Sequence, residues 1–475
     1  MKLRQILLPL FALVALSAGA VELLELIGDN MVLQQQSNAK LWGWSKPEMV
    51  VRITTSWDKH SYSVKANEQG RWEVAVKTPS ASYTPYYITF KDAEGEVKAS
   101  DVLVGEVWFA SGQSNMEMPL NGFWCQPVEK SNQTIAYSGQ YKGLRMATIE
   151  KTAATEPKDR VKGVWKKSCP ENSQWFSALG YFFAEALTKM LDVPVGIINC
   201  SWGGSKVEGW LPREELEKYK DVDLSQAGDS KVRQWDQPLI MYNGMINPLI
   251  GYTVKGFIWN QGESNVGHHD TYAQRLAKMV SIWREKWGDE KLPFYSVEIP
   301  PYSYGDVDGD WAANLRVAQH DAAKIIPNSG IVCTSDLVYP YETEDIHASQ
   351  KQPIGERLAF LAVAKTYGLK GIACESPEFE SLKIEGEKAI LHFINAQDGL
   401  TPNRNLEGFE VAGADGKFYP AEANENMQSR DIILTCKNVP QIEQVRYCFK
   451  NWAIGKVHNH RGLPLVPFKT SAKIQ

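Results

Sequence analysis

The alternation of short apolar runs with longer helical patterns is the feature that most constrains the fold of this chain. Between residues 101 and 371, apolar runs of strand length are interspersed with segments whose apolar side chains recur at helical spacing. Repeated strand–helix units predict an α/β fold, in which helices cover both faces of a parallel sheet. The predicted strands are residues 102–110, 193–200, 254–259, 294–299 and 330–335, and the predicted helices are residues 176–191, 272–287, 311–325 and 352–367.

A different pattern flanks this region on both sides. Short alternating runs between turn-forming residues predict a β-sandwich before the α/β region and a second β-rich region after it. A chain of 475 residues is also longer than one hydrophobic core usually supports. We therefore expect an N-terminal β-sandwich domain in residues 21–100, an α/β domain in residues 101–371 and a C-terminal β-rich domain in residues 372–475.

The first 20 residues have the pattern of a secretory signal peptide. Lys2 and Arg4 precede the apolar run 6–16, and an Ala-Gly-Ala cleavage motif ends at Ala20. No later apolar run is long enough for a membrane helix. We expect a protein that is exported to the periplasm or the extracellular space and does not insert into the membrane.

Composition excludes two broad classes of protein. The formal net charge is −5 and no block is rich in Lys and Arg, so the electrostatic footprint of a nucleic-acid binder is missing. Hydrophobic residues make up 43% of the chain and charged residues 23%, which excludes a largely disordered protein.

The chain has seven cysteines, and none of them are spaced as CxxC, so a zinc or redox site is not expected. An exported protein can form disulfides, and the first pairs to test are Cys125 with Cys169 and Cys436 with Cys448. Cys200 and Cys333 end apolar runs, which predicts buried free thiols.

Polar clusters follow the predicted strands at the points where the strands end. Residues 112–115 follow the first strand, 199–205 end the second, and the amide-rich 260–265 follow the third. An acid–histidine pair lies in residues 344–347, just before the last predicted helix. Because ligands of open α/β sheets bind outside the carboxyl ends of the strands, we expect these clusters to meet at one edge.

Each cluster alone has an ordinary structural explanation. A serine such as Ser114, just past a strand, most often caps a helix or forms a turn, and a lone histidine is usually structural. Together, the clusters supply the parts of an acyl-transfer site. A serine nucleophile needs a histidine base, a carboxylate that orients the base, and N–H donors for the oxyanion. The expected donors are the backbone N–H groups of Ser114 and Gly204 and the side-chain amide of Gln261.

These motifs resemble the sialate O-acetylesterase family, which are carbohydrate esterases built on the flavodoxin-like SGNH-hydrolase fold. An ordinary α/β-hydrolase elbow does not fit, because Met116 interrupts the G-x-S-x-G pattern. The resemblance rests on four blocks and extends to both flanking β regions. The four blocks are residues 112–119, 199–210, 259–265 and 345–347, and the flanking matches are 29–34, 41–44, 445–447 and 461–464.

The resemblance implies that Ser114 is the nucleophile, His347 the general base and Asp345 the orienting acid, with no cofactor. Ala348 stands where the family usually has proline. The wider superfamily places its acid three residues before the histidine, which is Glu344, so both acids stay open. We expect activity to rise with pH through the titration of His347, and a rate that is flat from about pH 5 to 8 would count against that role.

Other residues near the motifs are candidates for binding an acetylated sugar. Arg316 would reach an anionic substrate, although a solvated or salt-bridged surface arginine is the default. Trp124 and Trp311 lie on predicted loops, where an indole can stack on a sugar face. His268 and His269 have no matching ligand set, so no metal is expected. The candidate substrate-binding residues are Gln113, Asn115, Glu263, Trp124 and Arg316.

Three functions fit these residues. The first is a serine O-acetylesterase that acts on carbohydrates, preferably on O-acetylated sialic acids. The second is an acetyl-xylan esterase or another polysaccharide O-acetylesterase. The third is a non-catalytic glycan-binding protein built from the two β regions, which predicts that Ser114 and His347 lie far apart.

Overall fold

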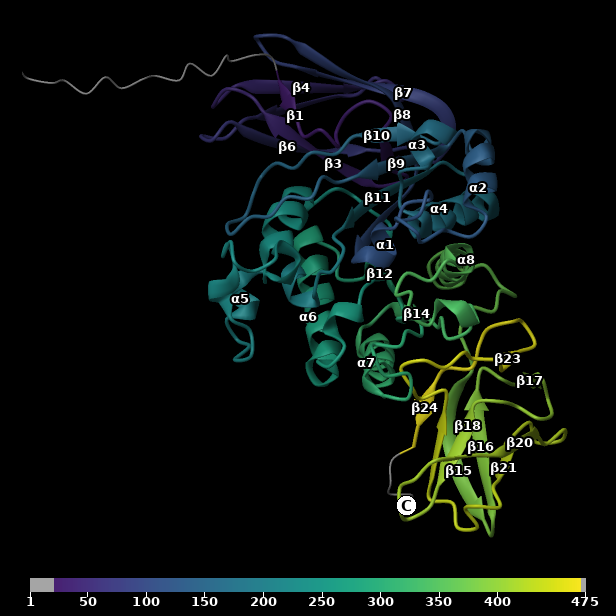
Figure 1. Ribbon diagram of the computed structural model, residues 1–475. Coiled ribbons are helices and arrows are strands. Elements are labelled where there is room, and N and C mark those ends of the chain that lie inside the picture. Colours follow the sequence, from purple (N-terminus) through teal and green to yellow (C-terminus); the bar gives the residue numbers. More distant parts are fainter. Residues whose placement is uncertain (1–20, 471–475) are drawn as a thin grey trace, which may run out of the picture.

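The computed structural model describes residues 21–470, so the predicted signal peptide lies outside the described residues. A large sheet runs through the middle of the molecule in the order β10-β9-β11-β8-β12-β13-β14 (Figure 1). All neighbours along this path pair in parallel except β10, which is antiparallel to β9. The strands are β8 (Glu96–Gly112), β9 (Leu144–Thr148), β10 (Trp165–Lys167), β11 (Val195–Ser201), β12 (Gly256–Asn260), β13 (Phe294–Val297) and β14 (Ser329–Val332).

Helices cover both faces of this sheet, which confirms the predicted α/β fold. Neighbouring side chains of β8 point to opposite faces, as in any strand. Trp108 packs on Phe183 under one helical layer, whereas Phe109 packs on Trp283 under the other. The layers pair α4 with α8 and α6 with α7 (Figure 1). These helices are α4 (Ala178–Leu191), α6 (His269–Trp287), α7 (Trp311–Ile325) and α8 (Lys351–Leu361).

The sequence pattern locates most of these elements, and the differences have physical causes. The predicted helix 311–325 coincides with α7, whereas α8 ends at Leu361 because the chain continues as the π-helix η9 (Ala362–Thr366). Strand β9 was not predicted, since a charged residue interrupts its apolar run. That residue is Arg145, which is buried and paired with Asp101 at 3.1 Å.

The N-terminal β region shares strand β8 with the α/β sheet. The first half of β8 pairs with β7 and β2, and its second half is the central strand of the parallel sheet, so the predicted division between residues 100 and 101 falls inside β8. A second sheet, β1-β3-β6, packs on this one through Trp72 and Phe90. The strands are β1 (Glu22–Leu23), β2 (Val32–Gln34), β3 (Asn38–Trp44), β4 (Val50–Thr55), β5 (Ser61–Lys65), β6 (Arg71–Lys77) and β7 (Ser82–Lys91).

The C-terminal β region has a hydrophobic core of its own. It contains two four-stranded sheets, β15-β16-β21-β20 and β19-β18-β22-β24, and is the lowest part of the molecule in Figure 1. Its buried core includes Leu391, Val411 and Tyr447. The strands are β15 (Glu378–Glu385), β16 (Lys388–Ile394), β17 (Leu400–Thr401), β18 (Phe409–Ala412), β19 (Tyr419–Pro420), β20 (Glu422–Glu425), β21 (Ile432–Thr435), β22 (Gln444–Tyr447), β23 (His458–Asn459) and β24 (Phe468–Lys469).

Short helical segments connect the strands. Those near the candidate site follow the ends of β8, β11 and β12. The short helices are α1 (Ser114–Glu117), α2 (Ser131–Tyr137), α3 (Pro170–Ser173) and α5 (Arg213–Leu216), and the 3-10 and π segments are Ser138–Gln140, Val207–Trp210, Leu224–Gln226, Gln234–Asp236, Tyr242–Ile246, Asn247–Leu249, Glu263–Asn265 and Pro340–Glu342.

All seven cysteines are free thiols, so the two disulfides suggested by the sequence do not form in this structure. Cys436 and Cys448 each direct their sulfur at a different backbone carbonyl, those of Pro420 and Ile454. The predicted burial of Cys200 and Cys333 as free thiols is confirmed. None of the helices within residues 21–470 is both long and apolar enough to cross a membrane.

Arg316 differs from its predicted role, because its guanidinium is buried and bound to backbone carbonyls. It projects from α7 into the junction with the C-terminal β region and is only 1% exposed. Its guanidinium donates to the backbone carbonyls of Ile299 at 3.1 Å, Lys450 at 2.8 Å and Asn451 at 3.0 Å. These bonds hold the guanidinium against backbone carbonyls of the junction, so its paired donors are not presented to an anionic substrate.

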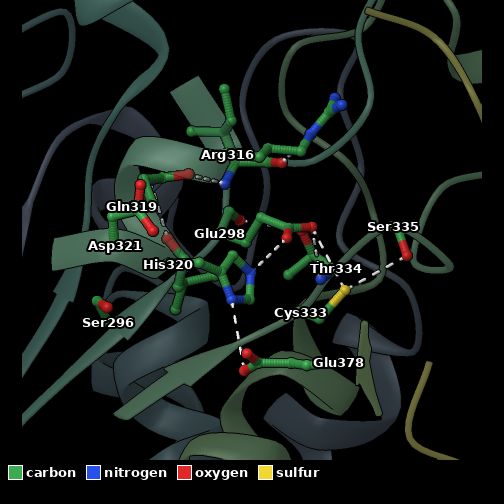
Figure 2. Close-up of polar contacts among 12 residues, drawn as sticks. Ser296, Glu298, Arg316, Gln319, His320, Asp321, Cys333, Thr334, Ser335 and Glu378 are labelled. Carbon is green, nitrogen blue, oxygen red and sulfur yellow. Dashed lines mark hydrogen bonds and ion pairs between the residues drawn. The ribbon is translucent and has the colours of Figure 1, made fainter. Parts of the chain in front are cut away.

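A buried cluster of polar side chains reinforces the same junction. Figure 2 shows Glu298, His320 and Glu378 pointing toward one another. Glu298 is fully buried, and its carboxylate lies 2.8 Å from His320 Nε2 and accepts the Thr334 N–H at 3.3 Å. His320 Nδ1 lies 4.0 Å from a carboxylate oxygen of Glu378, at the start of the C-terminal β region. A buried carboxylate requires such partners, so this cluster fixes α7 against β15.

We expect the stability of the protein to depend on the bonds of Arg316 at this junction. Arg316→Met leaves three buried carbonyls without their donors, and we expect the free energy of unfolding to fall by about 2 kcal/mol. Urea denaturation followed by tryptophan fluorescence measures the change. Arg404→Met, at an exposed arginine of the C-terminal region, is the matched control and should lose less than about 0.5 kcal/mol. Equal losses in both variants would contradict the anchoring role of Arg316.

Candidate active site

Ser114 lies where the central strand of the sheet ends. Strand β8 stops at Gly112, and Ser114 is the first residue of α1. On either side, Gly112 is in register with Ser201 of β11 and Asn260 of β12. After β8 the chain forms β9, β10 and β11 on one side of that strand and then crosses to β12 on its other side. Such a switch point is where open α/β sheets bind ligands. The three predicted strand-end clusters therefore meet at one place.

The glycine pair after β11 packs directly against the serine. A Cβ added to Gly203 would lie 3.3 Å from Ser114 Cβ, so the backbones approach closely. The Gly203 N–H donates to the Glu117 carboxylate at 2.6 Å. Gly204 has φ +81°, and within residues 21–470 neither its N–H nor that of Ser114 has an acceptor. Two backbone donors of the expected oxyanion site are therefore unoccupied.

Gln261 does not have the free amide that its expected oxyanion role requires. It is fully buried, and its two N–H donors bind the Ser205 carbonyl at 3.1 Å and Asn265 Oδ1 at 2.7 Å. Its side-chain oxygen Oε1 lies 3.0 Å from the Tyr272 hydroxyl, which also lies 2.8 Å from the Gln261 backbone carbonyl oxygen. Both N–H donors of Gln261 are therefore occupied and brace the Gly-Gly turn, which corrects the sequence-based assignment.

The ring of His347 is held by a residue that the sequence did not suggest. His347 Nδ1 lies 2.7 Å from the side-chain oxygen of Gln126, and Gln126 Nε2 donates to Asp345 Oδ1 at 2.7 Å. The same Asp345 oxygen accepts the His347 backbone N–H at 2.9 Å. Asp345 therefore reaches the imidazole through Gln126 and makes no direct bond to the ring. Glu344 instead accepts from the Ser303 hydroxyl at 2.9 Å.

This arrangement fixes the tautomer of His347. An amide oxygen only accepts, so the neutral ring carries its proton on Nδ1 and an electron pair on Nε2. Nε2 is buried and has no hydrogen-bond partner among the described residues. The expected bond between Ser114 Oγ and this ring is therefore absent here, which corrects that prediction. Phe123 packs edge-on against the imidazole at 5.1 Å between ring centroids.

The surroundings of His347 disfavour its charged form. Burial, together with the positive charge of Lys351, lowers the pKa of His347 to about 4. Lys351 is itself 1% exposed, and its Nζ donates to Asn115 Oδ1 at 2.6 Å. Burial also lowers the pKa of Lys351 to about 8. His347 is consequently neutral, and able to accept a proton, well into the acidic range.

Asn115 connects the loops of the site and does not face substrate. It is 1% exposed, and its Nδ2 donates to the Glu263 carboxylate and to the Ile346 carbonyl at 3.0 Å. With Lys351 on its Oδ1, every polar atom of the side chain is used. Burial raises the pKa of Glu263, whose second oxygen has no partner among the described residues. Asn115 and Glu263 therefore brace the site, contrary to their expected contact with sugar.

Gln113 has the same bracing function. It is 2% exposed, and its side-chain oxygen accepts from the backbone N–H groups of Gly262 at 3.2 Å and Ser264 at 3.3 Å. The residue before the nucleophile position thus holds the loop after β12. This burial disfavours the expected contact between Gln113 and a sugar.

Two exposed indoles border the site. Trp124 is 92% exposed and lies in the same loop as Phe123 and Gln126. Trp235, which the sequence did not suggest, lies against Gly204, where an added Cβ would come within 2.6 Å of its ring. No spacing or motif connects Trp235 to the site, since it lies in the short 3-10 segment Gln234–Asp236, 31 residues after Gly204 in the chain. Both rings offer apolar faces of the kind on which sugars stack.

His268 and His269 follow the amide-rich loop after β12. Among residues 21–470, no group of three or more His, Cys, Asp or Glu side chains is arranged to hold a metal ion. His269 instead lies 3.2 Å from the neighbouring carboxylate of Asp270.

Comparisons with known proteins agree on the family. A family model described as carbohydrate esterase, sialic acid-specific acetylesterase, matches residues 104–364. The sialate O-acetylesterase of Homo sapiens is 26% identical over 488 residues, which cover 93% of this chain and 91% of the relative. That of Mus musculus is 24% identical over 535 residues, covering 98% and 97%.

A solved structure extends this similarity to the three-dimensional fold. The crystal structure of a carbohydrate acetylesterase from Xanthomonas citri superimposes with a TM-score of 0.84 at 32% identity, covering 95% of this chain and 99% of that one. The chain is a carboxylic ester hydrolase and belongs to the sialic acid-specific acetylesterase family of carbohydrate esterases.

Proposed function

We propose that this protein is a serine esterase that removes O-acetyl groups from sialic acids. The observation that carries the proposal is the geometry around His347. Its Nδ1 is held by Gln126, and the electron pair on Nε2 is left without a partner in a buried site near the end of β8. A neutral, pre-oriented imidazole with a free nitrogen is what a serine nucleophile requires as its base.

The reaction follows from these groups. Ser114 Oγ attacks the acetyl carbonyl carbon while His347 Nε2 takes the hydroxyl proton. The tetrahedral oxyanion accepts hydrogen bonds from the backbone N–H groups of Ser114 and Gly204. His347 then returns the proton to the sugar oxygen as the C–O bond breaks, which leaves an acetyl group on Ser114. Water, deprotonated by His347, hydrolyses that ester and releases acetate.

Gln126 and Asp345 support this proton transfer from the other side of the ring. When Nε2 is protonated, the charge of the imidazolium is shared with Nδ1–H, which donates to the Gln126 oxygen. The hydrogen bond from Gln126 to Asp345 prevents the amide from rotating. Asp345 is therefore proposed as an acid that acts through an intervening amide.

The sialate assignment is supported by the names of the curated relatives, which are sialate O-acetylesterases. The related Xanthomonas citri structure is described more broadly as a carbohydrate acetylesterase, so an acetylated polysaccharide such as xylan is the second candidate. Trp124 is the proposed stacking surface in either case, because its indole is almost fully exposed beside the His347 loop. Export, through the signal-like pattern of residues 1–20, fits an extracellular glycan substrate.

The function is tested by acetate release from O-acetylated sialic acid and from acetylated xylan. We expect the sialic acid to be cleaved at least about tenfold faster, and Ser114→Ala to lower kcat by about 10⁴-fold or more because the nucleophile is lost. Ser429→Ala, at an exposed serine of the C-terminal region, should retain full activity. A preference for xylan would remove the sialate assignment, and undiminished hydrolysis by Ser114→Ala would remove the mechanism.

The pH dependence tests the state of His347. Because its pKa is lowered to about 4, the base is already neutral at pH 5, and kcat should be nearly constant from about pH 5 to 8 and fall below that range. This replaces the rise across the neutral range expected from an ordinary histidine. Lys351→Met removes a nearby positive charge and should move the acidic midpoint upward. A parent midpoint between about pH 6 and 7 would contradict the account.

The Gln126 bridge predicts a further kinetic effect. Gln126→Ala removes the acceptor for Nδ1–H, so the ring is no longer held in one tautomer, and we expect kcat to fall by about 10²-fold with little change in KM. Steady-state kinetics on a small acetate ester measure both constants. Gln133→Ala, at an exposed glutamine of α2, is the control and should match the parent. A change confined to KM would argue that Gln126 binds substrate instead.

A further inference from the structure

The carboxylate of Glu117 lies directly beside the expected oxyanion site. Glu117 is the last residue of α1, the short helix that begins at Ser114. Its Oε2 accepts the backbone N–H of Gly203 at 2.6 Å. A Cβ added to Gly203 would lie 3.3 Å from this oxygen and 3.3 Å from Ser114 Cβ. The helix that begins at Ser114 therefore also holds the turn that follows β11.

The peptide group that carries the Gly204 N–H is held on both sides. On one side, the Glu117 carboxylate binds the N–H of Gly203. On the other side, the Ser264 hydroxyl donates to the Gly204 carbonyl at 2.8 Å. Because both neighbouring peptide groups are fixed, the peptide between the two glycines is restricted in rotation, and its N–H keeps one direction.

A glycine pair requires such restraint. Strand β11 ends at Ser201, so the pair lies beyond the strand. Glycine has the widest choice of backbone conformations, and Gly204 adopts a φ of +81° in the left-handed region. A donor stabilises an oxyanion only when it already points to the place where the charge develops. The bonds to the flanking peptides supply the order that two glycines lack.

A cation compensates the charge of the carboxylate. Lys151 Nζ lies 2.7 Å from Glu117 Oε1 and 5.8 Å from the ring centroid of Trp202. Lys151 follows β9 in the chain, so a further segment is connected to the turn. Without this ammonium, the negative charge of Glu117 would repel an oxyanion that forms at the Gly204 N–H. Both side chains are partly exposed, so solvent weakens this repulsion.

We infer that Glu117 is a positioning residue for the Gly204 oxyanion donor and that Lys151 compensates its charge. Glu117 acts through the Gly203 peptide group and does not itself contact the reacting atoms. The inference rests on the proposed function, because it takes Ser114 as the nucleophile and the Gly204 N–H as a donor to the oxyanion. It adds two charged side chains to those on which the reaction depends.

Two substitutions separate the acceptor of Glu117 from its charge. Glu117→Gln keeps an oxygen for the Gly203 N–H, and we expect kcat for a small acetate ester to fall less than about fivefold. Glu117→Met removes the acceptor, so kcat should fall by about 10²-fold, as when an oxyanion donor is lost. KM should change little in either variant, because the donor acts in the transition state. Glu156→Met, at an exposed glutamate, is the control and should match the parent.

The compensating role of Lys151 is tested by combining substitutions. Lys151→Met alone leaves the Glu117 carboxylate unpaired and should lower kcat by about threefold. In the Glu117→Gln background the same change should have no further effect, since no negative charge remains there. Lys218→Met breaks another 2.7 Å ion pair with a glutamate and should leave kcat unchanged. Equal effects of Lys151→Met in both backgrounds would refute the compensation.

Binding of methylboronic acid distinguishes oxyanion positioning from a general structural effect. The Ser114 Oγ–boron bond forms as the hydroxyl proton passes to His347, which gives a tetrahedral anion that resembles the transition state. We expect Glu117→Met to weaken this binding by about the factor by which it lowers kcat/KM. Ser264→Ala frees the other side of the same peptide, and it should lower kcat and boronate affinity together by about tenfold.

Thermal unfolding verifies that each variant is folded. If Glu117→Met does not fold, Ser264→Ala with Lys151→Met in the two backgrounds decides the inference. Unchanged kcat in Glu117→Met, or a loss of activity without a matching loss of boronate affinity, would overturn the inference and leave the proposed function intact. Full activity of Ser114→Ala would refute the proposed function, and this inference with it.

Discussion

The close approach of β8 and β12 at Gly112 is the constraint on which the candidate site depends. A side chain at this position would place its Cβ 2.0 Å from the Asn260 carbonyl oxygen, and the φ of +140° is one that favours glycine. The strand can therefore turn away from the sheet immediately, and Ser114 opens α1 beside the Gly-Gly turn of β11. Asn115 then binds the loop of Glu263 and the loop of His347, so three distant segments hold one geometry.

The chemistry of His347 depends more on the residues that surround its ring than on the imidazole itself. Gln126 is a neutral acceptor, and it determines which nitrogen of His347 is free. The desolvated ring and the nearby ammonium of Lys351 favour the neutral imidazole. The negative charge of Asp345 is one hydrogen bond further away than in a direct acid–histidine pair. A base of this kind stays active in acid, because protonation of the resting ring is costly.

The sequence predicts the fold well and the site only in part. Apolar periodicity locates the main strands and helices, because both faces of the parallel sheet are buried. The polar clusters at the strand ends identify Ser114, Gly204 and His347 as candidate site residues. It fails where partners come from irregular loops: Gln126 and Trp235 have no spacing that marks them. It also cannot tell a polar residue that faces substrate from one that braces a loop, so Asn115, Gln261 and Arg316 were misassigned. Each of these is buried, and each binds groups far away in the chain.

Gln126 holds His347 as the neutral Nδ1–H tautomer. Nitrogen NMR of protein labelled with ¹⁵N-histidine tests it most directly, with His347→Gln used to assign the signals. The account predicts a protonated Nδ1 and an unprotonated Nε2 for His347 throughout the range from about pH 5 to 8, with titration only below it. An Nε2–H tautomer, or an imidazolium at pH 6, would contradict it.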